Sequence, residues 1–238
     1  MFFLTCSKAL SISFIRSICF CVIIGIFRLR PPFAPSVICI YYKYAYCVFG
    51  LAAVVGLRRG EIAALKRSDF NFKRRIISIN KNAVYSYENH KRVDGPPKTF
   101  DSERDLFLSD FAKEVYKIMS KRNTERNLLK LRNNNPEGYL FINYTGYPIS
   151  VNVLSSCVRL ASKEWEKVGG VRVRLHDARH SYATALYNNY KMPISDISAV
   201  LGHSSYKTTE IYLHKMKSAT IAPKVVGVLK ALDASIKD

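Results

Sequence analysis

The chain has 238 residues, with 37 lysines and arginines against 18 aspartates and glutamates, which gives a formal net charge of +19. Hydrophobic residues make up 48% of the sequence, which excludes a disordered polyelectrolyte. The length suits one large domain, or one domain with an appendage, that buries its own core. A foldable chain with this basic surplus is expected to bind a polyanion, nucleic acid first and an anionic membrane surface second.

Residues 1–40 differ in composition from the rest of the chain. The first acidic residue is Glu61, and residues 18–27 form an apolar run (ICFCVIIGIF) that is shorter than the roughly 20 residues a membrane-spanning helix needs. We interpret residues 1–40 as an atypical hydrophobic leader that is not a domain. A hydrophobic packing segment and a secretory signal or anchor are the alternatives. Three prolines before residue 36 mark the boundary with a body at 41–238.

The cysteines are concentrated near the amino terminus. Five of the six lie within the first 47 residues, and Cys157 is the sixth. Their spacings do not form two matching pairs of a zinc-binding pattern, so no metal site is expected. A body with a lone cysteine is typical of a reducing compartment, which predicts a cytoplasmic protein.

The first half of the body is expected to contain two helices and a small sheet. Residues 41–55 are almost entirely apolar and predict a buried helix that ends at Gly56, and a short helix is expected at 60–66. Strands are predicted at 74–79, 83–87 and 104–108, the last two separated by a Gly95-Pro96-Pro97 loop. Together they would form one small antiparallel sheet.

The second half of the body has a helical pattern. Its expected helices cover 109–121, 125–132, 150–168, 177–188, 195–201, 205–214 and 221–234, and one short strand covers 139–143. Gly202 is expected to end the helix at 195–201. The predicted fold class is therefore α+β, a mostly helical domain with one small antiparallel sheet.

A few polar residues stand in short motifs that are far apart in the sequence. They are Arg58 in GLRRGE, Lys98 in KTFDSER, His176 and Arg179 in HDARHSYAT, His203 in LGHSS and Tyr212 in TTEIYLH. Two guanidinium groups can hold both non-bridging oxygens of a phosphodiester and match the added charge of its pentacovalent transition state. A nucleophilic tyrosine needs such cationic surroundings, and a histidine that titrates near neutrality can move its proton. A lysine can protonate the departing oxygen, and the set contains no carboxylate cluster for Mg²⁺.

These motifs, in this order and approximate spacing, resemble those of the tyrosine recombinases (phage integrase family) over about residues 41–217. The resemblance implies a nucleophile at Tyr212, phosphate-clamping arginines at Arg58 and Arg179, catalytic histidines at His176 and His203, and a general-acid lysine at Lys98. It implies site-specific breakage and rejoining of double-stranded DNA through a covalent 3′-phosphotyrosine, without ATP, metal, cofactor or small-molecule substrate. Ala178 replaces a residue that is more often leucine in the family, a departure that should not affect the chemistry.

The family also usually carries an amino-terminal domain that grips the opposite face of the duplex, and residues 1–40 do not resemble it. Because phosphate contacts dominate DNA affinity, we expect weak, salt-sensitive binding and impaired or absent recombination. The alternative function is a truncated, catalytically silent fragment that binds DNA or a recombinase. A third is a membrane-anchored basic protein. The resemblance further implies a homo-oligomer, a tetramer on DNA, held through the helix at 221–234 and its apolar residues.

Several residues of the same type compete with the six candidates. They are Arg59 beside Arg58, the cations Lys81, Lys91 and Arg92 near Lys98, and Tyr206, which lacks the TTxxY setting of Tyr212. In each case the motif favours the candidate named first.

Three residues of these motifs also have structural interpretations. Glu61, three residues after Arg58, is expected to be an arginine's partner and not a base. His180 follows His176 by four residues, as in the HExxH of zinc proteases, but we interpret it as a core or supporting histidine. His203 could also be an ordinary residue after a helix-ending glycine, and here too the motif favours the catalytic interpretation.

Overall fold

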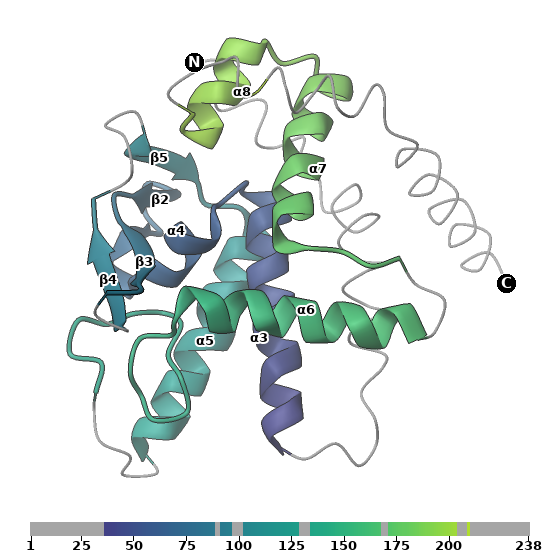
Figure 1. The fold of residues 1–238 in the computed structure, drawn as a ribbon. Coiled ribbons are helices and arrows are strands. Elements are labelled where there is room, and N and C mark those ends of the chain that lie inside the picture. The colour runs from purple at the N-terminus through teal and green to yellow at the C-terminus, as the bar shows by residue number, and fades with distance from the viewer. Residues whose placement is uncertain are drawn as a thin grey trace, which may run out of the picture.

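The computed structural model describes residues 36–88, 91–96, 102–128, 134–167 and 171–203, together with Thr209. Within these residues, helices pack around two small antiparallel sheets (Figure 1), which confirms the α+β class. The elements in chain order are α3 (Ser36–Val54), α4 (Arg59–Ala64), the 3-10 helix η1 (Arg67–Asp69), β1 (Phe70–Asn71), β2 (Ile76–Ile79), β3 (Asn82–Ser86), β4 (Lys91–Gly95), β5 (Arg104–Phe107), α5 (Asp110–Leu128), α6 (Val151–Lys167), α7 (Leu175–Asn188) and α8 (Ile194–Leu201).

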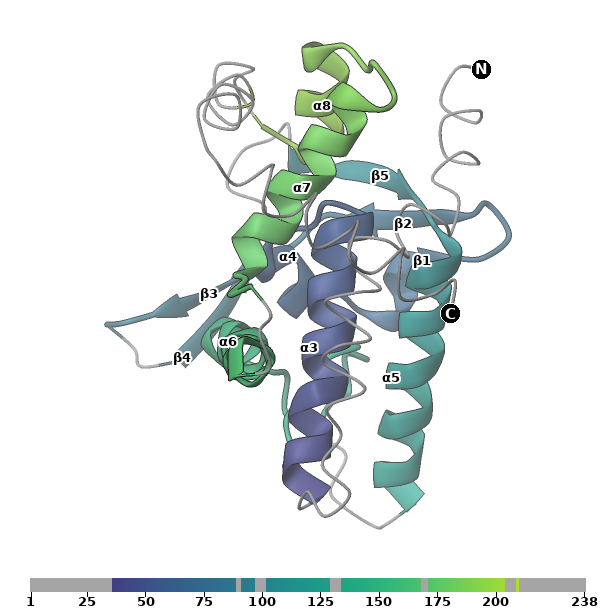
Figure 2. The ribbon, with the colours of Figure 1, turned by 90° about the vertical axis from the view of Figure 1, so that its right-hand side faces the viewer.

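Helix α3 is the centre of the domain. It contacts α5, α6 and α7, and Figure 2 shows α3 and α5 running side by side while α6 is seen nearly end-on. Val48, Leu51 and Ala52 of α3 are completely buried. A helix covered on several sides has no solvent-facing stripe, which explains why its sequence is apolar almost throughout. The helix begins at Ser36, earlier than the predicted start at residue 41.

The strands form two sheets, so the prediction of a single sheet is wrong. Strand β2 lies between β1 and β5 in one sheet. Among the described strands, β3 and β4 pair only with each other, with Val84 opposite Val93. The sequence interpretation missed β4 because its residues, KRVDG, are charged and mostly exposed and show no apolar alternation. The hairpin packs against α4 and α6 through β3.

Two predictions in the second half of the body are also corrected. Helix α5 runs without interruption to Leu128, whereas separate helices were expected at 109–121 and 125–132. Asn123 is a weak helix former, but it is buried and its amide donates to the Leu140 carbonyl at 3.1 Å, so tertiary contacts override its propensity. The segment expected to be a strand at 139–143 forms only isolated bridges, between Lys66 and Tyr139 and between Ile142 and Pro148. Its apolar side chains are nevertheless buried, which explains the strand-like pattern in the sequence.

The last three described helices agree with the sequence pattern. Helices α6, α7 and α8 match the predicted ranges to within two residues, and Gly202 ends α8 in the left-handed conformation with φ 65°. The predicted helices at 205–214 (apart from Thr209) and at 221–234 lie outside the described residues, as does the predicted leader apart from residues 36–40. In the part of the chain that the structure describes, no helix is both long and apolar enough to span a membrane.

Candidate active site

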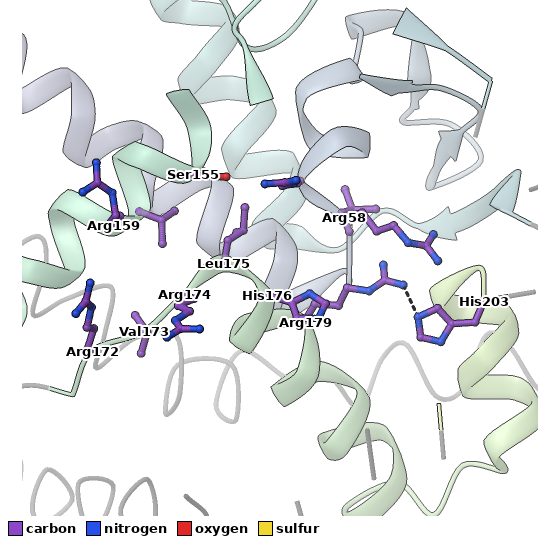
Figure 3. Close-up of a pocket in the computed structure, with 13 residues that line it drawn as sticks. Arg58, Ser155, Arg159, Arg172, Val173, Arg174, Leu175, His176, Arg179 and His203 are labelled. Carbon is purple, nitrogen blue, oxygen red and sulfur yellow. Dashed lines mark hydrogen bonds between the residues drawn. The ribbon is translucent and has the colours of Figure 1, made fainter. Parts of the chain in front are cut away.

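A basic pocket of about 560 Å³ opens where α4, α6, α7 and the end of α8 meet (Figure 3). Its charged lining residues, among those that the structure describes, are all cationic. They are Arg58, Arg59, Arg159, Arg172, Arg174 and Arg179, and the pocket is also lined by His176 and His203. Walls of one charge concentrate the opposite charge, so the pocket selects an anionic ligand.

Four of the six predicted site residues line this pocket together. Arg58 immediately precedes α4, and His203 follows the glycine that ends α8. His176 and Arg179 lie one turn apart at the start of α7, as their spacing predicted. The other two candidates, Lys98 and Tyr212, lie outside the described residues. The structure thus brings together four chemically matched side chains from distant parts of the chain, and their catalytic roles stay predictions.

Beneath the pocket, the carboxylate of Glu61 is bound by three arginines. It accepts hydrogen bonds from the backbone N–H and from Nη1 of Arg58, both at 2.8 Å. Both of its oxygens accept from Arg104, at 3.1 and 3.0 Å, and Nη1 of Arg179 lies 3.9 Å away. Glu61 is only 2% exposed. The prediction that Glu61 is an arginine's partner is confirmed.

These arginines determine the charge of Glu61. Burial by itself raises the pKa of the carboxyl group, but the hydrogen bond from Arg104 and the charges of Arg104, Arg179 and Arg58 outweigh it. The pKa of Glu61 therefore lies below its ordinary value, and the side chain is ionised at neutral pH.

The same three arginines also bind the carboxyl end of α8. The last carbonyls of a helix lack partners within the helix, and they carry its partial negative charge. Here each of three consecutive carbonyls accepts a hydrogen bond from a different guanidinium group: Val200 from Arg104 at 2.7 Å, Leu201 from Arg179 at 2.6 Å, and Gly202 from Arg58 at 2.5 Å. Glu61 and α8 therefore fix the guanidinium groups from two sides.

Ser102 and Arg104 are site-supporting residues that the sequence interpretation did not single out. The hydroxyl of Ser102 donates to the Gly202 carbonyl at 3.1 Å, and the Arg104 side chain is buried and does not line the pocket. Their only signal in the sequence was their place in the KTFDSER motif, and the sequence analysis assigned no role to them. Arg104, the first residue of β5, and Ser102, two residues earlier, connect this part of the chain to α4 and to the turn that carries His203.

Two of the cations that compete with Lys98 make structural contacts. Arg92 donates to the carbonyls of Ile149 at 2.8 Å and Ala63 at 3.1 Å, so it fastens the β3–β4 hairpin to the domain. Lys81 lies 3.6 Å from the carboxylate of Asp69. These contacts account for Arg92 and Lys81 without a role in the pocket.

Both histidines of the pocket are neutral at pH 7. Burial, followed by the charges of Arg179 and Arg58, lowers the pKa of His203 to about 3. Burial and Arg179 also lower the pKa of His176. The sequence-based expectation of a histidine that titrates near neutrality is therefore wrong for His203, because burial and the neighbouring guanidinium charges oppose a positive charge on its ring.

Glu61→Gln is expected to destabilise the fold by about 3–5 kcal/mol at pH 7, because it leaves buried arginines without their counter-charge. Since folding lowers the pKa of Glu61, its charge stabilises the protein above the ordinary carboxyl pKa, and this contribution is lost as the pH falls through the lowered value. Urea unfolding at pH 7 and at pH 4 would show the difference between the wild type and the variant shrinking at low pH.

The matched control is Glu164→Gln on α6, whose carboxylate makes a solvent-exposed pair with Lys167. This pair should contribute less than about 1 kcal/mol, so the control should unfold close to the wild type. Equal stability of the two variants at pH 7 would contradict a central role for Glu61.

The chain was compared with known proteins at the levels of sequence and fold. The sequence model of the phage integrase family matches residues 38–219. A probable integrase of prophage ps2 from Lactococcus lactis subsp. lactis is 28% identical over 172 residues, which cover 70% of this chain and 44% of the relative. A XerC-like tyrosine recombinase from Caldanaerobacter subterraneus is 27% identical over 178 residues, with the same coverages. The chain thus spans less than half the length of these relatives.

Solved structures show the same fold. The Tn1549 transposon integrase in complex with transposon right end DNA has a TM-score of 0.61 at 18% identity, covering 76% of this chain and 61% of that one. XerA recombinase has a TM-score of 0.54 at 21% identity, covering 84% and 60%. The match to the family's sequence model extends over most of the chain and includes every described residue of the pocket, and so the chain belongs to the phage integrase family.

Proposed function

We propose that the protein breaks and rejoins double-stranded DNA at specific sites through a covalent 3′-phosphotyrosine. The observation that carries this proposal is the convergence of Arg58, Arg179, His176 and His203 on one pocket whose described charged residues are all cationic. The family match also spans the positions of Lys98 and Tyr212. This arrangement suits a phosphodiester, because it gathers positive charge and hydrogen-bond donors in one place.

In the proposed reaction, the phenolic oxygen of Tyr212 attacks the scissile phosphorus, and the bond from phosphorus to the 5′ oxygen breaks. The phenolic proton passes to a base, for which a neutral imidazole is suited, and Lys98 gives a proton to the departing 5′ oxygen. The new phosphotyrosine ester conserves the energy of the broken diester, so attack by another 5′-hydroxyl rejoins a strand without ATP. Guanidinium groups supply the positive charge that metal ions supply in other phosphoryl-transfer sites.

The pre-set geometry of the arginines supports catalysis rather than binding alone. Arg58 uses one terminal nitrogen for Glu61 and the other for Gly202, and its side chain is still 34% exposed toward the pocket. A donor held in place before the substrate arrives loses little free energy to reorganisation when charge develops in the transition state.

The outer wall of the pocket supports a long polyanion as the ligand. Arg159 on α6 and Arg172 and Arg174 before α7 are exposed, and none of them forms an ion pair with a carboxylate in the described part of the chain. Unpaired cations in a row beyond the four central side chains suit the successive phosphates of a nucleic-acid backbone.

The triple substitution Arg159→Gln, Arg172→Gln and Arg174→Gln is therefore expected to weaken DNA binding and reduce its salt dependence. Each lost phosphate contact should lower the slope of log affinity against log salt by about 0.9. Fluorescence anisotropy with a labelled duplex at several salt concentrations measures this slope. Lys121→Gln on α5, an exposed residue away from the pocket, is the control and should leave the slope unchanged. An unaltered slope in the triple variant would exclude these arginines as phosphate contacts.

The chemistry is tested by trapping the covalent intermediate on a nicked duplex, from which the short cleaved strand diffuses away. We expect an adduct of protein and DNA that survives SDS, that is lost in Tyr212→Phe and that is retained in the control Tyr206→Phe. Absence of the adduct from a folded wild-type protein that binds DNA would favour the alternative, a catalytically silent binding fragment.

We also propose that the protein acts as a tetramer on DNA, assembled through residues 221–234. The support is the apolar pattern of that segment, in which Val225, Val226, Val228, Leu229 and Leu232 would form one face of a helix. Sedimentation of the complex formed on two joined sites should give four protomers, and Leu229→Asp should reduce this number. A complex that contains one protomer per site with no association between sites would contradict the proposal.

A further inference from the structure

Thr209 is a buried residue beside the pocket to which the proposed reaction assigns no role. Its side chain is completely buried, and its hydroxyl oxygen lies 2.9 Å from Nδ1 of His203. It stands in the TTEIYLH motif, three residues before the proposed nucleophile. A buried hydroxyl beside a ring nitrogen raises the question of which atom carries the proton.

The contact on the opposite side of the ring answers that question. Nε2 of His203 lies 3.1 Å from Nη2 of Arg179, as the dashed line in Figure 3 shows. A guanidinium group can only donate, so Nε2 must accept and cannot carry a hydrogen. A neutral imidazole has one N–H, which must then be on Nδ1 and must point at Thr209.

The backbone of His203 is also held in place, so only rotation of its side chain has to be fixed by the contacts of the ring. The His203 N–H donates to the Ser198 carbonyl at 3.0 Å, as part of the cap of α8. Hydrogen bonds at both ring nitrogens oppose this rotation.

We propose that Thr209 is a positioning residue that holds His203 as the Nδ1–H tautomer, with the lone pair of Nε2 directed at Arg179 and the pocket. The Thr209 oxygen can accept from Nδ1–H whether the ring is neutral or protonated. Nε2 can therefore gain or lose a proton without any turning of the ring. When a phosphate oxygen takes the place of Nε2 at Arg179, His203 can donate to that oxygen only after Nε2 has been protonated. This catalytic consequence rests on the proposed function, whereas the tautomer does not.

The tautomer is measured by NMR on the full chain labelled with ¹⁵N-histidine, without DNA, at pH 7. Long-range ¹H–¹⁵N correlations distinguish the two tautomers, and the His203→Gln variant identifies the signal. We expect the Nδ1–H pattern in the wild type and in Thr209→Ser, and a growing Nε2–H population in Thr209→Val, which has the same shape but no acceptor. Thr124→Val on α5 is the control. It removes a threonine hydroxyl that donates to the Ser120 carbonyl and should leave the His203 signal unchanged.

The same variants are then tested for cleavage of the nicked duplex. We expect Thr209→Val to cleave about 3- to 10-fold more slowly at unchanged DNA affinity, and Thr209→Ser to keep the wild-type rate. An Nε2–H pattern in the wild type, or a Thr209→Val variant with the wild-type tautomer and rate, would overturn the inference. The wild-type spectrum decides the tautomer even if Thr209→Val does not fold. A protein that shows the Nδ1–H pattern but forms no adduct would refute the proposed function and leave the role of Thr209 in place.

Discussion

The site depends on one buried carboxylate. Glu61 is held by Arg104 and Arg58 through hydrogen bonds, and Arg179 lies within ion-pair distance. Three guanidinium groups that converge in a protein interior would repel one another, and removing them from water is costly. A single glutamate makes the arrangement possible, and it leaves the cluster with an excess of positive charge. That excess borders the pocket, where an anionic ligand can compensate it.

The carboxyl end of α8 binds the same three arginines as Glu61 and holds them from the other side. Its final carbonyls accept from the arginines that Glu61 orients, so helix capping and preparation of the site use the same hydrogen bonds. His203 follows directly in the chain, and its position is therefore fixed relative to Arg58 and Arg179. Ser102 and Arg104 extend the network to β5. Arg58, Arg179 and His203 are consequently held by contacts within the protein.

The sequence predicted the long apolar helix, α6 to α8 and the grouping of four site residues, because apolar periodicity, glycine caps and short motifs are local signals. It missed β4, whose exposed hairpin has no buried face to produce a pattern, and it divided α5 at Asn123, which a tertiary hydrogen bond retains within the helix. It assigned no role to Arg104 or Thr209, because their partners, Glu61 and His203, are identified only when the chain is folded. The motifs were sufficient to predict four residues that line the pocket, but the supporting residues Arg104 and Thr209 could be recognised only from the folded structure.

The low pKa of His203 is a consequence of its position beside these fixed arginines. Burial contributes most, and the charges of Arg179, Arg58 and Arg104 lower the pKa further. A bound phosphodiester would bring a negative charge against those same cations, and a nearby opposite charge favours the protonated imidazole. The pKa of His203 should therefore rise when the pocket is filled, which makes proton uptake at Nε2 part of substrate binding. In the structure the histidine accepts from Arg179. Under the proposed function it would donate to a phosphate oxygen once Nε2 is protonated, so its positive charge would lie beside an anion.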